Sequence, residues 1–154
     1  MVPNLRTVLA GCLLTVGLFS VTAAAQDPKK KDDKGDPAVK VALTQTSAVQ
    51  LLPDYTQRTK KGTDSAVGEL VRKDGLTISY DIGWYGAQTL ENTLWSKEQM
   101  LFGKKVKIVF SKQKELLVVV GAGEKVHASF YSKVKSEEDV AEILLIVLSY
   151  THQN

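Results

Sequence analysis

A β-hairpin signature in the middle of the chain constrains the fold more than any other feature. Residues 66–72 and 76–83 carry apolar side chains at alternate positions, and the short polar segment 73–75 separates them. That segment ends in Gly75, and glycine readily adopts the left-handed backbone that closes a three-residue hairpin loop. On the face that should be buried, the expected pairs are Arg72 with Leu76, Leu70 with Ile78, Gly68 with Tyr80 and Ala66 with Ile82. On the other, half-polar face they are Val67 with Asp81, Glu69 with Ser79 and Val71 with Thr77.

Further strands are expected in the second half of the chain. Residues 105–111 and 115–120 form a second hairpin pattern around the turn 112–114. Because residues 116–120 are apolar without a break, their strand should lie inside the sheet, covered on both sides. Residues 125–134 alternate and predict another strand, whose core-facing residues are Val126, Ala128 and Phe130.

The chain is expected to close with an amphipathic helix. Ser136 is a suitable N-cap, and the three acidic residues that follow it complement the helix dipole. The apolar stripe comprises Val140, Ile143, Leu144, Val147 and Leu148, and Leu145 and Ile146 widen it. A helix this apolar should bury its stripe against the sheet that the hairpins form.

Together these patterns predict an α+β fold, with a mostly antiparallel sheet of about four to six strands packed against a C-terminal α-helix. Residues 39–154 have the length of a single α+β domain with one hydrophobic core. Within that domain, residues 93–101 fit a short helix. Residues 39–52 fit an opening strand or a helix that ends before Pro53.

The first 25 residues have the pattern of a secretory signal peptide. Arg6 is their only charged residue, an apolar run covers residues 8–21, and three alanines precede Gln26. Signal peptidase is therefore expected to cut after Ala25. The run is shorter than the about 20 residues of a membrane-spanning helix, so no transmembrane segment is expected in the mature chain.

Cys12 offers an alternative to that cleavage, because residues 9–12 match the pattern at which bacterial lipoproteins are cut and acylated on cysteine. Cleavage there would leave little apolar sequence upstream and would place the most apolar stretch, residues 13–21, directly after the lipid. Position therefore favours cleavage after Ala25 over a lipid anchor at Cys12. Cys12 is also the only cysteine, so the mature chain is expected to have no disulfide.

Residues 26–38 predict a disordered, charged linker. Lysines and aspartates are mixed there without a large apolar side chain, so burial cannot offset the entropy lost on ordering. Loss of residues 1–25 removes only Arg6 among the charged residues and lowers the formal net charge from +3 to +2. So small a charge does not indicate a nucleic-acid partner.

Two segments resemble a pattern found in small exported bacterial proteins of uncharacterised function. They are residues 62–68, Gly-Thr-Asp-Ser-Ala-Val-Gly, and residues 78–83, Ile-Ser-Tyr-Asp-Ile-Gly. The resemblance covers only this part of the chain and implies the hairpin and an extracytoplasmic setting. It implies no activity.

Two carboxylates form the first candidate site. The hairpin register places Ser65 opposite Gly83, so Asp64 and Asp81 should lie near the same open end of the hairpin. Such a pair could hold a divalent cation or act as an acid and a base. The structural alternative is that Asp64 caps a turn and Asp81 is a solvated strand-end residue, which the small number of oxygen ligands favours.

Three aromatic residues, Trp84, Tyr85 and Trp95, form the second candidate site. They flank the least regular segment, residues 84–103. Aromatic side chains on loops bind ligands and partner proteins, and they serve equally well to seal the edge of a small core. The sequence leaves both roles open for these three residues and favours the role in the core.

The histidines give no site from sequence alone. His127 and Ser129 share one face of a predicted strand, but side chains two positions apart stand about 7 Å from each other, too far for a nucleophile and its base. His127 is therefore expected on the surface and His152 in a frayed terminus, which disfavours a zinc site.

No complete catalytic, metal-binding or phosphate-binding motif occurs in the sequence, and no cofactor is expected. The leading hypothesis is an exported, soluble, non-enzymatic domain of the periplasm or the extracellular space. Its partner would be a protein or small ligand of the cell envelope, bound through Asp64, Ser65, Asp81, Trp84, Tyr85 and Trp95. The alternative is a hydrolase or divalent-metal-dependent enzyme that uses Asp64 and Asp81.

Overall fold

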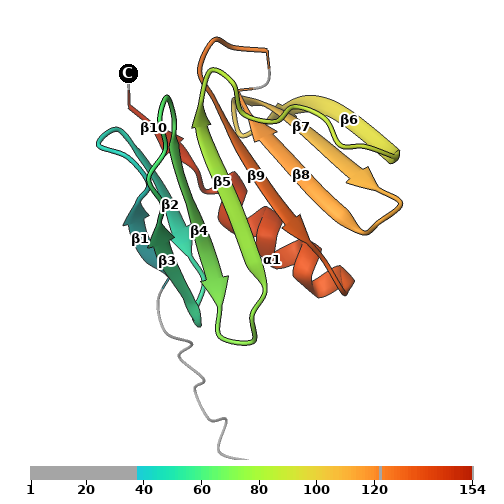
Figure 1. The fold of residues 1–154 in the computed structure, drawn as a ribbon, viewed down its shortest axis with the longest axis horizontal. Helices are drawn as coiled ribbons and strands as arrows, with labels where there is room; N and C mark the ends of the chain where they lie inside the picture. Colours follow the sequence, from blue (N-terminus) through green and yellow to red (C-terminus); the bar gives the residue numbers. More distant parts are fainter. Residues whose placement is uncertain (1–37, 122, 154) are drawn as a thin grey trace, which may run out of the picture. The chain divides into compact units, whose positions relative to one another are not determined.

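The computed structural model describes residues 38–121 and 123–153, so the predicted signal peptide and residues 26–37 of the predicted linker lie outside the described residues. The described residues form ten β-strands and one α-helix (Figure 1). In chain order they are β1 (Val39–Ala42), β2 (Ser47–Leu51), β3 (Tyr55–Thr59), β4 (Ala66–Arg72), β5 (Thr77–Gly83), β6 (Thr93–Leu101), β7 (Lys104–Ser111), β8 (Glu115–Val120), β9 (His127–Lys133), α1 (Glu137–Leu148) and β10 (Thr151–His152).

The strands make two sheets. The large sheet has seven strands in the order β3-β4-β5-β9-β8-β7-β6, and the small sheet has three in the order β1-β2-β10. All pairings among these strands are antiparallel, which confirms the predicted α+β class and the antiparallel sheet. The predicted number of strands is too low, because strands of two to five residues such as β1, β3 and β10 are too short for an alternating pattern to stand out.

The first hairpin has the predicted register, with Leu70 facing Ile78 and Val67 facing Asp81. Gly75 has a φ of +95°, and the Arg72 N–H donates to the Leu76 carbonyl at 2.8 Å, which closes the three-residue loop. We call the face of the large sheet that carries Leu70 and Ile78 the inner face. The opposite side, which carries Asp81, is the outer face.

The second hairpin is also confirmed, and β8 lies inside the sheet as predicted. Leu116, Val118 and Val120 join the main core on the inner face, while Leu117 and Val119 form a smaller cluster with Val109 on the outer face. Strand β9 begins at His127, two residues later than predicted. Val126 is therefore exposed rather than core-facing, because the Glu124 N–H closes a turn onto the Gly121 carbonyl just before it.

Helix α1 lies against the inner face and contacts β8 and the small sheet through β2 (Figure 1). Ser136 is its N-cap as predicted, and a capping box links Ser136 with Asp139. Ile143, Ile146 and Val147 are fully buried, but Leu145 is 62% exposed, so it does not widen the apolar stripe. Its position on the helix points it away from the sheet. No helix in the described part of the chain is long and apolar enough to cross a membrane.

Two segments with ambiguous patterns prove to be β-structure. Residues 93–101 are the edge strand β6 rather than a short helix, because they pair along their length with β7. The turn between them is Phe102-Gly103, where both residues have positive φ, as in the tight turns that favour hairpins. Residues 39–52 contain the strands β1 and β2 of the small sheet, which is the strand alternative.

The C-terminal residues are part of the fold. Tyr150 is buried, and its ring lies edge-on to Phe130 with 5.8 Å between the ring centroids. His152 belongs to β10, and its Nδ1 lies 2.7 Å from the Ser47 hydroxyl, so the prediction of a frayed terminus is wrong at this position. Pairing of β10 with β2 is the physical reason.

Candidate functional site

A connecting segment covers part of the outer face of the large sheet. This segment, residues 84–92, joins β5 to β6 and passes over the strands between them; we call it the strap (Figure 1). Leu90 of the strap packs against the outer cluster that includes Leu117 and Tyr131. The Lys112 N–H donates to the Asn92 carbonyl at 3.1 Å, which fixes the far end of the strap at the β7–β8 turn.

His127 and Ser129 of β9 hold the near end of the strap. Ser129 Oγ donates to the Ala87 carbonyl at 2.8 Å, and His127 Nε2 lies 3.1 Å from the Gly86 carbonyl. Since a carbonyl only accepts, Nε2 carries the hydrogen of this bond. A β-carbon at Gly86 would lie 2.8 Å from Ser129 Oγ, so the strap approaches the sheet closely here. The expectation of a surface His127 is wrong: the residue is 2% exposed because the strap covers it.

Asp81 lies beside these two residues on the outer face. It is half-buried and faces Ser129 directly across β5 and β9. Among the described residues, Asp81 Oδ1 and His127 Nδ1 are the buried side-chain polar atoms without a hydrogen-bond partner.

The other predicted polar residues lie at the open end of the hairpin. A β-carbon at Gly83 would lie 2.7 Å from Ser65 Cβ, which agrees with the predicted position of Ser65 beside Gly83. Asp64 is exposed, whereas Asp81 is half-buried on the outer face. Within residues 38–121 and 123–153, no group of three or more His, Cys, Asp or Glu side chains could hold a metal ion.

The three predicted aromatic residues are exposed and are not core residues. Trp84 and Tyr85 follow β5 directly and are 61% and 83% exposed. Trp95 is 48% exposed and lies on β6 opposite Phe110. Three strands, β9, β8 and β7, separate β5 from β6. The fold therefore brings Trp84 and Tyr85 together and leaves Trp95 on a second surface, the free edge of the large sheet.

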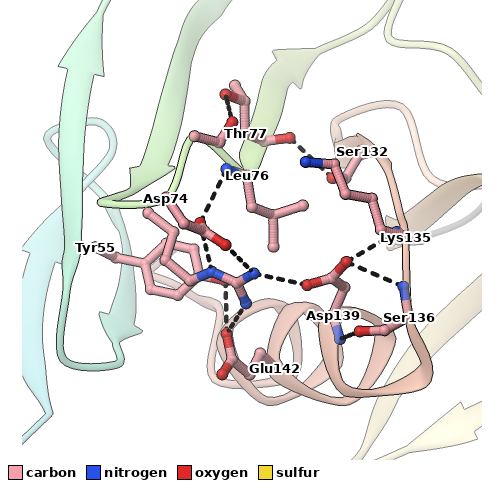
Figure 2. A network of polar contacts seen from close by, with 11 residues as sticks. Tyr55, Asp74, Leu76, Thr77, Ser132, Lys135, Ser136, Asp139 and Glu142 are labelled. Carbon is pink, nitrogen blue, oxygen red and sulfur yellow. Dashed lines mark hydrogen bonds and ion pairs between the residues drawn. The ribbon is translucent and has the colours of Figure 1, made fainter.

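Sequence reasoning missed a network of charged residues around Arg72 (Figure 2). The Arg72 guanidinium donates to Asp74 at 2.8 and 2.7 Å, to Asp139 at 2.7 Å and to Glu142 at 2.6 Å. Tyr55 donates to the same Glu142 oxygen at 3.0 Å. The network joins the β4–β5 turn to the start of α1. The sequence did contain an indication of this network, because the hairpin register places Arg72 on the buried face, where a charged side chain requires ion-pair or hydrogen-bond partners.

The pKa values in this network follow from its contacts. Hydrogen bonds from Arg72 hold the pKa of Asp74 well below its usual value, helped by the Leu76 N–H. Burial acts to raise the pKa of Asp139. The Lys135 N–H, the Arg72 guanidinium and the Ser136 N–H outweigh burial and lower it. Burial, followed by the bond to Glu142, raises the pKa of Tyr55. The contacts that cause these pKa shifts also hold the β4–β5 turn against α1, so the role of the network is structural.

A further hollow of about 330 Å³ lies where the C-terminal residues meet the ends of β7 and β9. Lys104, Tyr150 and His152 are among the residues that line it. Lys104 Nζ donates to the carbonyls of Leu148 and Tyr150, so this lysine binds the C-terminal end of α1. Its ammonium group stabilises the helix terminus in the absence of a basic residue in the last turn.

The geometry of the domain thus gives two exposed aromatic surfaces, the strap and the edge of β6, and a covered polar cluster of Asp81, His127 and Ser129. Comparisons with known protein families and with curated proteins find no match to this chain.

Proposed function

We propose that this chain is an exported, non-enzymatic domain that binds a partner protein or small ligand through the aromatic residues of the segment 84–103. The observation that carries the proposal is the exposure of Trp84 and Tyr85, at 61% and 83%. Large exposed aromatic side chains are enriched at binding surfaces, where they bury much apolar area and lose few rotamers.

Anchoring of the strap supports this function. Hydrogen bonds from His127 and Ser129 hold Gly86 and Ala87, directly after the two aromatic residues, and Leu90 is packed on the sheet. The backbone that presents Trp84 and Tyr85 is therefore already ordered before binding. Binding to an ordered segment costs less conformational entropy than binding to a flexible loop.

Alanine variants of the aromatic residues test the proposal in cross-linking capture from an envelope extract. A partner captured by the wild type should be lost with Trp84→Ala combined with Tyr85→Ala, with Trp95→Ala, or with both sets. Leu145→Ala is the matched control, because Leu145 is about as exposed as Trp84 but lies on α1. Thermal melting confirms that each variant is folded. Capture that survives all three aromatic substitutions would refute the proposal.

Export is tested separately by mass spectrometry of the mature protein. The proposed cleavage after Ala25 gives a mature chain that begins at Gln26. A lipid-modified N-terminus at Cys12 would instead establish membrane anchoring. Retention of Met1 in cytoplasmic protein would contradict export, and with it the setting implied by the resemblance to small exported proteins.

The unpartnered Asp81 Oδ1 favours a second candidate, a hydrolase or divalent-metal-dependent enzyme that uses Asp64 and Asp81. Calcium and zinc titrations followed by thermal melting test its metal-dependent form. A ligand at 100 times its dissociation constant adds about 2.7 kcal/mol to the free energy of unfolding. A stabilisation that Asp81→Asn abolishes would favour this candidate. An unchanged melting temperature with both ions would argue against the metal-dependent form.

A further inference from the structure

We propose that the free edge of β6 binds an extended acidic peptide segment of a partner protein, which adds to the large sheet as an eighth strand. The inference rests on the proposed binding function and names the partner's chemistry. It concerns the edge that carries Trp95, not the strap that carries Trp84 and Tyr85.

The backbone of β6 is available for such a strand. β6 is the last strand of the large sheet and is nine residues long, so it pairs on one side only, with β7. In an antiparallel edge strand, every second residue directs its N–H and C=O groups away from the sheet. Among the described residues, no backbone hydrogen bond outside the sheets involves residues 94–101. A partner strand would satisfy these groups.

The opposite edge of the sheet is less open. β3 has five residues, and the Gln57 side chain on it donates to the Ala42 carbonyl of β1 at 3.0 Å. Tyr55, at the start of β3, is buried and bonded to Glu142. Side-chain hydrogen bonds to the small sheet and to α1 therefore occupy this edge, whereas none within the described residues joins β6 to either.

Side chains on β6 define what the added strand should carry. The inner-face row contains Trp95, Lys97 and Leu101, which face Phe110, Ile108 and Lys104 of β7. In the described structure, exposed Lys97 forms no ion pair, whereas its neighbour Glu98 is paired with Lys105 at 2.8 Å. The uncompensated charge on the edge is therefore positive. An acidic residue opposite Lys97 and apolar residues opposite Trp95 and Leu101 would complement the row.

A second copy of the chain fits this edge less well than a different strand. In antiparallel pairing, opposite residues point to the same face, so a symmetric β6 pair must place one residue opposite itself. A pair centred on Lys97 places the two copies of Lys97 opposite each other, and a pair centred on Glu98 does the same with the two copies of Glu98. A pair centred on Ser96 places Trp95 opposite Lys97 and Leu94 opposite Glu98. These three registers place like charges, or a charge and an apolar side chain, opposite each other, and a pair centred on Trp95 joins only residues 93–97 of β6, so a different, acidic strand is the better occupant.

Direct binding of a designed peptide tests the inference. The probe is a fluorescein-labelled nine-residue peptide rich in threonine, with leucine, aspartate and valine spaced to face Leu101, Lys97 and Trp95 in antiparallel register. Its matched control has lysine in place of aspartate. Fluorescence anisotropy should show that the aspartate peptide binds at least about tenfold more tightly than the lysine peptide, a difference of about 1.4 kcal/mol.

A charge-reversal variant separates recognition from a structural effect. Lys97→Glu should invert the preference, so that the lysine peptide becomes the tighter ligand. Lys125→Glu is the control, since Lys125 is an exposed lysine outside β6 and should leave the preference unchanged. Hydrogen exchange should slow at the amides of β6 when the aspartate peptide is bound. Equal binding of the two peptides, an uninverted preference in Lys97→Glu, or protection of β3 instead of β6 would overturn the inference.

Failure of this inference differs from failure of the proposed function. If capture of the partner depends on Trp84 and Tyr85 while the peptides do not bind β6, the strap is the binding surface and only the inference fails. If capture depends on neither the strap nor Trp95, the proposed function itself fails.

Discussion

Arg72 carries more of the polar contacts between hairpin and helix than any other single residue of the network. Replacing it with methionine keeps the apolar stem but leaves Asp139, whose side chain is 6% exposed, without its cation. We expect Arg72→Met to lower the free energy of unfolding at pH 7 by about 2 kcal/mol, measured by urea denaturation. Lys60→Met is the control, because the Lys60–Glu69 pair is exposed and should change stability by less than about 1 kcal/mol.

The same variant should change the pH dependence of stability. The pKa values of Asp74 and Asp139 lie below their usual values in the folded protein. Groups with lowered pKa stabilise the fold above their unfolded pKa of about 4, and this contribution is lost as the pH falls through the folded pKa. Wild-type stability should therefore fall on acidification below about pH 4. Arg72→Met should show a smaller fall, and equal slopes for the two proteins would contradict this role.

Single residues were the hardest features to infer from sequence. Trp84 and Tyr85 were assigned correctly to an irregular segment, but their exposure depends on the path of the strap. His127 looked like a surface residue because its strand face is polar, and only the strap, which is distant in sequence, buries it. Residue type and spacing report local structure. They do not report which distant segment covers a polar face.

Helix α1 shows how closely burial depends on position within one element. Ile146 is fully buried and Leu145 is 62% exposed, although they are neighbours with similar side chains. We expect Ile146→Ala to lower the free energy of unfolding by about 2–5 kcal/mol through lost burial and a residual cavity. Leu145→Ala should change it by less than about 0.5 kcal/mol. Urea denaturation of both variants measures the difference, and similar losses would show that the helix is rotated from its described orientation.

Sequence patterns predicted those elements whose burial is both regular and local. The β4–β5 hairpin, the β7–β8 hairpin and α1 each have a turn or cap that fixes the register. β6 escaped prediction because nearly all of its residues are exposed, so no alternation of burial distinguishes a strand from a helix. Its signal was the Phe102-Gly103 turn. The candidate site residues follow the same rule. The position of Ser65 beside Gly83 could be predicted from the hairpin register, whereas the position of Trp95 on the edge strand could not.

The short C-terminal segment joins parts of the domain that are far apart in sequence. Tyr150 packs edge-on against Phe130 of the large sheet, and its hydroxyl lies 3.1 Å from Ser47 of the small sheet. β10 supplies the third strand of that sheet, and Lys104 binds the Tyr150 carbonyl. Small sheet, helix and large sheet thus share one core around this residue. Stability of the whole unit should therefore depend on this C-terminal segment, although sequence alone placed His152 in a frayed terminus.

Deletion of residues 150–154 tests this dependence. Loss of a buried aromatic side chain alone costs about 3–5 kcal/mol, a large part of the 5–15 kcal/mol that stabilises a typical domain. The truncated protein should therefore unfold at much lower urea concentration, with tryptophan fluorescence and circular dichroism changing together because the two sheets share a core. Deletion of residues 153–154 is the control, since it keeps Tyr150 and β10 and removes, from the described residues, Gln153, whose N–H donates to the Thr46 carbonyl. If deletion of residues 150–154 lowered the urea midpoint as little as the control deletion, the domain would be stable without its C-terminal segment. β2 would then hold the small sheet in the fold without β10.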